Sequence, residues 1–125
     1  DHYVLKNMPV AFCKTDLENW LKERQITTVT IVGYMTHNCD LSTAIAAMHR
    51  GFQVEFLSDA GGSLAYANRA GSATAEEIHR VMTVVMQSRF AAVLTTSEWL
   101  ECVVTGSAPE RDSIYSSNQR ALKGA

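Results

Sequence analysis

Short apolar runs alternate along the chain with segments in which apolar side chains recur at helical spacing. Runs rich in β-branched and aromatic residues predict four strands, at residues 3–5, 27–33, 53–57 and 90–94. The run at residues 27–33 is apolar enough to predict a central parallel strand that is buried on both faces. Helical spacing of apolar residues predicts four helices, at residues 17–25, 36–50, 75–89 and 96–103.

Capping and turn signals predict where these helices begin and end. Threonine followed three residues later by glutamate predicts capping boxes at Thr15 and Glu18, Thr74 and Glu77, and Thr95 and Glu98. Gly51 predicts a left-handed residue that ends the second helix. We expect a flexible break at residues 60–63, a short helical turn within residues 64–71 and an extended polar tail at residues 107–125.

The alternation of strands and helices predicts an α/β fold, with three α/β/α layers around a mostly parallel sheet. A length of 125 residues allows one core, and we assign residues 1–106 to a single domain. In such sheets, ligands bind beyond the carboxyl ends of the strands. The residues that follow the predicted strands should meet at that edge, and they are Lys6, Cys39, Asp59 and Thr95.

Composition and charge narrow the range of partners and compartments. Hydrophobic residues make up 46% and charged residues 19%, as in ordinary globular proteins. The 11 basic and 13 acidic residues give a net charge of −2, so neither nucleic acid nor a membrane is an expected partner. Three widely spaced cysteines predict reduced thiols and a cytoplasmic protein, and they are Cys13, Cys39 and Cys102.

Cys39 holds the position best suited to chemistry. It follows a predicted strand through a tight turn and lies in the first turn of the next predicted helix. Unpaired backbone N–H groups and the positive end of the helix dipole favour a thiolate there. The same N–H groups can hold the oxyanion that forms when a thiolate attacks a carbonyl carbon. A cysteine that acts only as a small buried apolar residue is the alternative.

Several motifs recur in a familiar order along the chain. Gly33, Thr36 and Cys39 give the pattern G-x-x-T-x-x-C. Around it stand Lys6 with Pro9, Ala11 and Phe12, then Thr43-Ala44, Gly51-Phe52-Gln53-Val54, Asp59-Ala60, and finally Phe90, Val93, Thr95, Thr96 and Glu98. Over residues 3–104 these motifs resemble the isochorismatase-like cysteine hydrolases, which include nicotinamidase and N-carbamoylsarcosine amidohydrolase. The resemblance implies hydrolysis of a C–N bond in a small amide-type substrate.

The resemblance also implies roles for particular residues. Cys39 would be the catalytic nucleophile, and the ammonium group of Lys6 would stabilise its thiolate. The backbone N–H groups of Met35 and Cys39 would hold the oxyanion, with a cis Tyr34–Met35 peptide turning the Met35 N–H inward. The side chains expected to contact substrate are Phe12, Tyr34 and His37.

The chain also departs from the family pattern. The family's third catalytic residue is an aspartate many residues before the lysine, so we expect the chain to be the C-terminal portion of a longer hydrolase. Asp40 stands where the family commonly has valine, and its carboxylate opposes the thiolate form of Cys39. We expect no cofactor and no metal, because His2, His49 and His79 share no ligand spacing and are expected at the surface; a metal held by an upstream segment is left open.

Two functions of other kinds stay open. Without its aspartate, the chain would be a non-catalytic binding or assembly module that keeps the fold. Cys39 would alternatively sense oxidants, with Cys13 as the resolving thiol. In either case we expect a homo-oligomer, because the family forms dimers and tetramers and the last apolar helix with its tail suits an interface.

Overall fold

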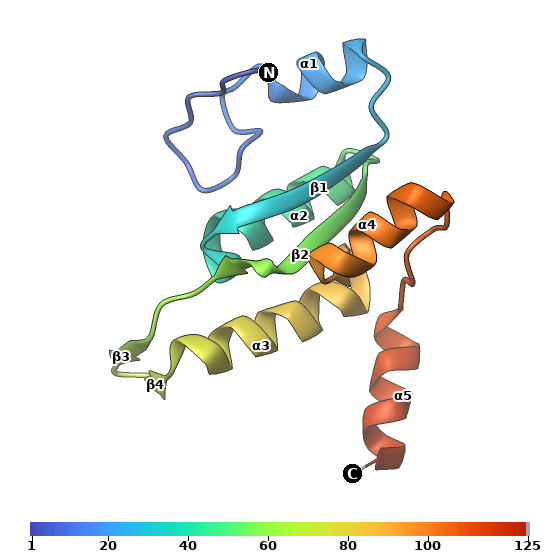
Figure 1. Cartoon of the computed structure of the whole chain (residues 1–125). Helices are drawn as coiled ribbons and strands as arrows, with labels where there is room; N and C mark the ends of the chain where they lie inside the picture. The colour runs from blue at the N-terminus through green and yellow to red at the C-terminus, as the bar shows by residue number, and fades with distance from the viewer. Residues whose placement is uncertain (125) are drawn as a thin grey trace.

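Three parallel strands form the sheet of the computed structural model (Figure 1). The central strand β2 (Gln53–Gly62) pairs in parallel with β1 (Thr28–Tyr34) on one side and with β5 (Ala92–Leu94) on the other. A small antiparallel hairpin, formed by β3 (Tyr66–Asn68) and β4 (Gly71–Ala73), extends away from the sheet after β2. This parallel sheet with flanking helices confirms the predicted α/β class.

Five α-helices and two π-helical turns accompany the sheet in the described part of the chain, residues 1–124. The α-helices are α1 (Leu17–Glu23), α2 (Leu41–His49), α3 (Ala75–Val85), α4 (Thr96–Thr105) and α5 (Ile114–Gly124). The π-helical turns are η1 (Thr36–Asp40), which leads into α2, and η2 (Met86–Phe90), which follows α3. None of the helices described is both long and apolar enough to cross a membrane.

The side chains of β2 alternate between two cores on opposite faces of the sheet. Val54 and Phe56 lie in the larger core, together with Met86 and two buried alanines of α2. Leu57 lies in the smaller core, against which Trp99 of α4 packs. Because β2 contributes to both cores, it is the strand that is buried on two faces.

β1 is an edge strand, which corrects the prediction that residues 27–33 are buried on both faces. Val29 and Ile31 pack against the larger core, whereas Val32 is 55% exposed. The reason is the strand order, since within residues 1–124 β1 pairs with β2 alone and helices cover one of its faces. Sequence periodicity cannot distinguish a strand at the centre of this sheet from one at its edge.

Two of the three predicted capping boxes are confirmed. Thr74 and Thr95 each accept a hydrogen bond from the backbone N–H three residues later, and the glutamate there accepts one from the threonine N–H. The predicted cap at Gly51 is also confirmed, because its φ of +88° lies in the left-handed region. These local signals set the starts of α3 and α4 and the end of α2.

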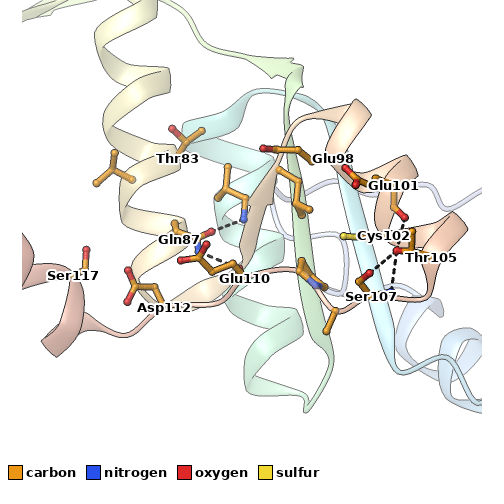
Figure 2. Close-up of a pocket in the computed structure, with 15 residues that line it drawn as sticks. Thr83, Gln87, Glu98, Glu101, Cys102, Thr105, Ser107, Glu110, Asp112 and Ser117 are labelled. Atoms are coloured by element: carbon orange, nitrogen blue, oxygen red, sulfur yellow. Dashed lines mark hydrogen bonds between the residues drawn. The ribbon is translucent and has the colours of Figure 1, made fainter.

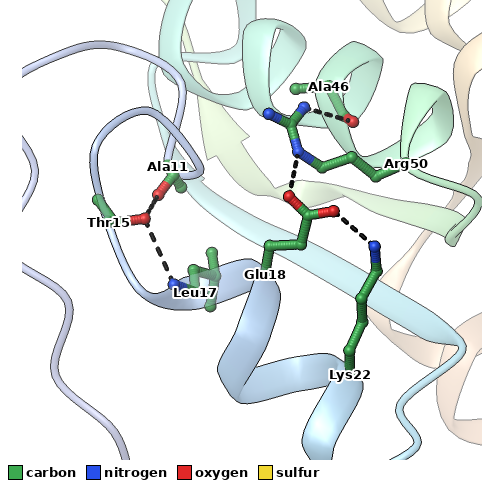
Figure 3. Close-up of polar contacts among 7 residues, drawn as sticks. All are labelled: Ala11, Thr15, Leu17, Glu18, Lys22, Ala46 and Arg50. Atoms are coloured by element: carbon green, nitrogen blue, oxygen red, sulfur yellow. Dashed lines mark hydrogen bonds and ion pairs between the residues drawn. The ribbon is translucent and has the colours of Figure 1, made fainter.

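The capping box predicted at Thr15 is wrong (Figure 3). The Thr15 hydroxyl donates to the Ala11 carbonyl at 2.6 Å. Glu18 accepts hydrogen bonds from Lys22 at 2.6 Å and from Arg50 at 3.0 Å, so its carboxylate is not free to reach back. These hydrogen bonds, that from Lys22 foremost, lower the pKa of Glu18. The glutamate therefore joins α1 to the end of α2 in place of capping α1.

Two predictions for the ends of the chain are wrong. Residues 3–5 form no strand, and Tyr3 is 84% exposed, because nothing in the described chain pairs with them. The tail at residues 107–125 is not wholly extended, because residues Ile114–Gly124 form α5, which leaves the body of the molecule (Figure 1). Residue 125 lies outside the described residues.

The segment between β2 and α3 also differs from its prediction. No break occurs at residues 60–63, because Gly61 and Gly62 resume pairing with Gly33 and Tyr34 of β1. Between Ile31 and Gly33 of β1 the register shifts, because β2 advances from Phe56 to Gly61 over the same stretch. Residues 64–71 contain strand and hairpin turn rather than a helical turn.

Gly61 brings the end of β2 against the turn that follows β1. A Cβ atom placed there would lie 2.8 Å from the Phe56 ring, 3.1 Å from the Gly33 carbonyl oxygen and 3.3 Å from Thr36 Oγ1. A Cβ at Gly62 would meet only Tyr34, at 3.6 Å, which is an ordinary contact. The close approach at Gly61 therefore requires glycine, and that at Gly62 does not.

We expect Gly61→Ala to lower the free energy of unfolding by about 1–3 kcal/mol, because an extra methyl group overpacks this contact. Gly62→Ala is the matched control, since it restricts the unfolded chain to the same extent. Urea unfolding of both variants measures the difference. Equal stabilities of the two variants would contradict the proposed close packing.

Candidate active site

The turn between β1 and α2 carries the candidate nucleophile. The Tyr34–Met35 peptide bond is cis, as the resemblance implied. Met35 then adopts an extended conformation and its carbonyl accepts hydrogen bonds from the backbone N–H groups of Asn38 at 3.0 Å and Asp40 at 3.2 Å. Cys39 lies within η1, and its side chain is partly exposed. The structure thus places this thiol at the carboxyl end of a parallel strand and just before a helix.

Lys6 and Cys39 come together although they are far apart in the sequence. Lys6 Nζ donates to Cys39 Sγ at 3.5 Å and to the Met8 carbonyl at 3.2 Å. Lys6 is exposed and is carried by a segment without regular secondary structure, rather than by the predicted strand. The structure thus places an ammonium group against the sulfur atom of the candidate nucleophile.

The remaining predicted site residues have different surroundings. Phe12 is 6% exposed and stacks on Phe52 in the larger core, which differs from its expected place in a substrate pocket. Tyr34 is 58% exposed at the end of β1. His37 Nε2 lies 2.7 Å from the Tyr66 hydroxyl, and the two rings meet edge to face. The hairpin strand β3 therefore reaches back to the residue two positions before Cys39.

Asp40 is a buried carboxyl beside the candidate nucleophile. It is 5% exposed, and its Oδ2 atom has no hydrogen-bond partner among the described residues. Burial raises the pKa of Asp40, and the positive charges of His37, His79 and Lys6 act against that rise. Helical geometry alone did not reveal this burial, which arises because α3 packs over η1.

His79 is not the surface residue that its isolated position predicted. Its ring is partly buried, with Nδ1 2.8 Å from Thr36 Oγ1 and Nε2 2.9 Å from the Ser58 carbonyl oxygen. The signal in the sequence was helical spacing, since His79 lies two turns before the fully buried Met86. A histidine on that face must point toward the sheet.

Asp59 connects two strand ends at the same edge of the sheet. Asp59 Oδ1 accepts hydrogen bonds from the Thr96 backbone N–H and hydroxyl, both at 2.8 Å. These bonds from Thr96, the hydroxyl bond foremost, lower the pKa of Asp59. The carboxylate thus fixes the start of α4 against β2, which is a structural use of a residue predicted to lie at this edge.

A cavity of about 730 Å³ lies away from Cys39, between α3, β5, α4 and residues 107–112 (Figure 2). Gln87 stands at one side of it, where its side chain accepts from the Val93 N–H and donates to the Glu110 carbonyl. None of the predicted site residues lines this cavity. Within residues 1–124, no three His, Cys, Asp or Glu side chains gather closely enough to hold a metal ion.

Replacing Lys6 by alanine tests the ammonium–sulfur contact. We expect the rate of Cys39 alkylation by iodoacetamide at pH 7 to fall about tenfold, because the sulfur atom loses the ammonium group that contacts it. Peptide mapping reports Cys13 and Cys102 in the same sample as internal references. Lys123→Ala, at an exposed position on α5, is the charge-matched control. An unchanged Cys39 rate in Lys6→Ala would show that the contact does not activate the thiol.

Replacing Asp40 by asparagine tests the buried carboxyl. Because its folded pKa is raised, the folded state binds the proton more tightly than the unfolded state, and ionisation of Asp40 weakens stability as pH rises above about 4. Asparagine does not titrate, so the stability of Asp40→Asn relative to the unmodified protein should increase from pH 4 to pH 7. Urea unfolding across that range measures it, and a pH-independent difference would contradict the raised pKa.

The family model described as the isochorismatase domain matches residues 1–98. The isochorismatase family protein YrdC of Bacillus subtilis (strain 168) is 33% identical over 98 residues, which make up 76% of this chain and 51% of that protein. The chain spans about half the length of the two curated relatives that match 98 of its residues.

Solved structures agree with this match. A putative isochorismatase from Burkholderia xenovorans LB400 is 59% identical with a TM-score of 0.95, over 98% of this chain and 59% of that one. A cysteine hydrolase from Pseudomonas syringae pv. phaseolicola 1448A is 28% identical with a TM-score of 0.81, over 86% and 51%. Nicotinamidase PncA from Bacillus subtilis is 31% identical with a TM-score of 0.61, over 74% and 46%. With the motif, the fold and the domain match in agreement, the chain belongs to the isochorismatase family of hydrolases.

Proposed function

We propose that the chain carries the nucleophile of a cysteine hydrolase that cleaves a C–N bond in a small amide-type molecule. The observation that supports this most directly is the 3.5 Å contact between Lys6 Nζ and Cys39 Sγ. A thiolate stabilised in this way is the form of cysteine that attacks a carbonyl carbon. The similarity to structures described as a cysteine hydrolase and a nicotinamidase supports the same reaction class.

In the proposed reaction, Cys39 Sγ forms a bond to the carbonyl carbon while the C=O π electrons move to oxygen. The backbone N–H groups of Met35 and Cys39 donate hydrogen bonds to that oxyanion. When the C=O bond re-forms, the C–N bond breaks, and the nitrogen takes up a proton and leaves as an amine or ammonia. Water then attacks the thioester on Cys39 and releases a carboxylic acid and the free thiol.

Proton transfer to the leaving nitrogen is the step for which we assign no residue of this chain. In the family an aspartate upstream of the lysine protonates the leaving nitrogen and takes a proton from the attacking water. Lys6 in our proposal keeps its charge and stabilises the sulfur, and Tyr34 and His37 border the substrate. The His37–Tyr66 contact at 2.7 Å supports this, since it orders the His37 ring within the turn that also carries Cys39.

We also propose that the active protein is a cytoplasmic homo-oligomer that binds no cofactor through these residues. Support for association comes from apolar side chains on α4 and α5 that are exposed in the single chain. They are Val103, Val104, Ile114, Tyr115 and Leu122.

A non-catalytic binding or assembly module is the second candidate. One observation favours it: within residues 1–124, the hydrogen bonds of Lys6 go to Met8 and Cys39, and none goes to a carboxylate. A hydrolase of this kind needs a group that transfers protons to the leaving nitrogen. The two candidates differ in whether a covalent acyl-enzyme forms on Cys39.

Incubation of the protein with a panel of small primary amides, nicotinamide included, distinguishes a hydrolase from a binding module. We expect release of ammonia, an acyl adduct on Cys39 in quenched samples by mass spectrometry, and a loss of at least about a thousandfold in rate in Cys39→Ser. Cys102→Ser is the matched control and should keep the rate. Binding of amides without any adduct or product would support the binding module and overturn the hydrolase proposal.

A further inference from the structure

A network of hydrogen bonds joins α3, the π-helical turn η1 and the end of β2. Thr36, the first residue of η1, is fully buried. Its Oγ1 atom lies 3.0 Å from the Gly62 carbonyl oxygen and 2.8 Å from His79 Nδ1. On the other side of the ring, His79 Nε2 lies 2.9 Å from the Ser58 carbonyl oxygen. Thr36 and His79 thus connect three elements that are distant in the sequence.

The hydrogen-bond partners of His79 and Thr36 limit where their hydrogen atoms lie. A carbonyl oxygen only accepts, so Nε2 of His79 must carry hydrogen and donate to Ser58. The Thr36 hydroxyl has one proton, which goes either to the Gly62 carbonyl or to His79 Nδ1. In the first case Nδ1 carries hydrogen and donates to Thr36; in the second it accepts. Both arrangements keep His79 bonded to Thr36.

Because these hydrogen bonds are buried, breaking one of them costs free energy. Phe56, which is fully buried, packs against the His79 ring at a centroid distance of 6.4 Å. Gly61 provides the space in which Thr36 Oγ1 approaches β2. A buried hydroxyl or ring nitrogen that loses its partner keeps its full desolvation cost, because water does not replace the partner.

We propose that His79 is a positioning residue for Cys39, acting through Thr36. Thr36 begins the turn, and the thiol lies three residues later, so a shift of Thr36 moves Cys39 relative to Lys6. The backbone bonds from Asn38 and Asp40 to Met35 close the turn but do not attach it to the sheet. Attachment comes from the Thr36 side chain, which His79 holds. The inference rests on the proposed function only for the role of Cys39.

Two substitutions of His79 distinguish its contact with Thr36 from its contact with Ser58. His79→Gln keeps an amide group near the position of Nε2, where it can bond to Ser58, but leaves Thr36 without its ring partner. His79→Asn keeps an amide near the position of Nδ1, where it can bond to Thr36. If positioning acts through Thr36, iodoacetamide should alkylate Cys39 about tenfold more slowly at pH 7 in His79→Gln than in the unmodified protein. In His79→Asn the Cys39 alkylation rate should stay within about twofold of that of the unmodified protein.

The alkylation rates of Cys13 and Cys102 report any general loosening of the fold. His49→Gln, which removes an exposed histidine of α2, is the matched control and should leave all three rates unchanged. Thr36→Val removes the hydroxyl at nearly constant volume, so it should slow Cys39 as His79→Gln does. The double variant should be no slower than either single one, because both interrupt the same contact.

Ring ¹⁵N chemical shifts of histidine-labelled protein test the contact between His79 and Thr36 without alkylation. The His79 signals are those absent from His79→Gln, and they should show a hydrogen-bonded Nδ1 atom whose shift changes in Thr36→Val. An Nδ1 shift that is the same in Thr36→Val as in the unmodified protein would overturn the inference, as would a Cys39 rate in His79→Gln equal to that of the unmodified protein, or additive effects in the double variant. These readouts need no substrate, so their failure is distinct from a failure to hydrolyse amides.

Discussion

The approach of β2 to the π-helical turn η1 is the contact on which the candidate site depends. Gly61 and Gly62 extend β2 past the register shift and bring its backbone against Thr36. A side chain at Gly61 would occupy the space that Phe56 and Thr36 share, so the fold needs a residue without one there. Because Thr36 begins the turn that carries Cys39, the packing of the sheet fixes where the thiol is presented.

A basic and an acidic residue, Lys6 and Asp40, lie near that thiol, and they differ in burial. Lys6 is exposed and approaches Cys39 from a segment without regular structure, so its side chain must be ordered to hold the contact. Asp40 is buried on η1 and has a raised pKa. Burial that raises a carboxyl's pKa disfavours its ionised form, which is the form that opposes a neighbouring thiolate. The burial of Asp40 therefore reduces the conflict that its sequence position implied.

Local patterns were sufficient to predict the elements that carry the nucleophile. The apolar run of β1, the capping boxes of α3 and α4 and the cap at Gly51 are encoded within a few residues, and each is confirmed. The contact between Lys6 and Cys39 was implied by the family resemblance. The strand topology also placed both residues at one edge of the sheet, but that argument depended on a strand at residues 3–5 that does not form. Edge position, the bulge in β2 and the burial of Asp40 and His79 depend on tertiary packing, which periodicity does not report.

The support of the turn is distributed over segments that come after it in the chain. His79 lies on α3, Gly62 on β2 and Tyr66 on the hairpin, and each contacts a residue of η1. Lys6, by contrast, precedes the turn and is exposed. The rigid side of the thiol is therefore built from β2, the hairpin and α3, while its ionic partner arrives on a more adaptable segment. Such a division lets the candidate nucleophile stay fixed while the segment that carries Lys6 adjusts.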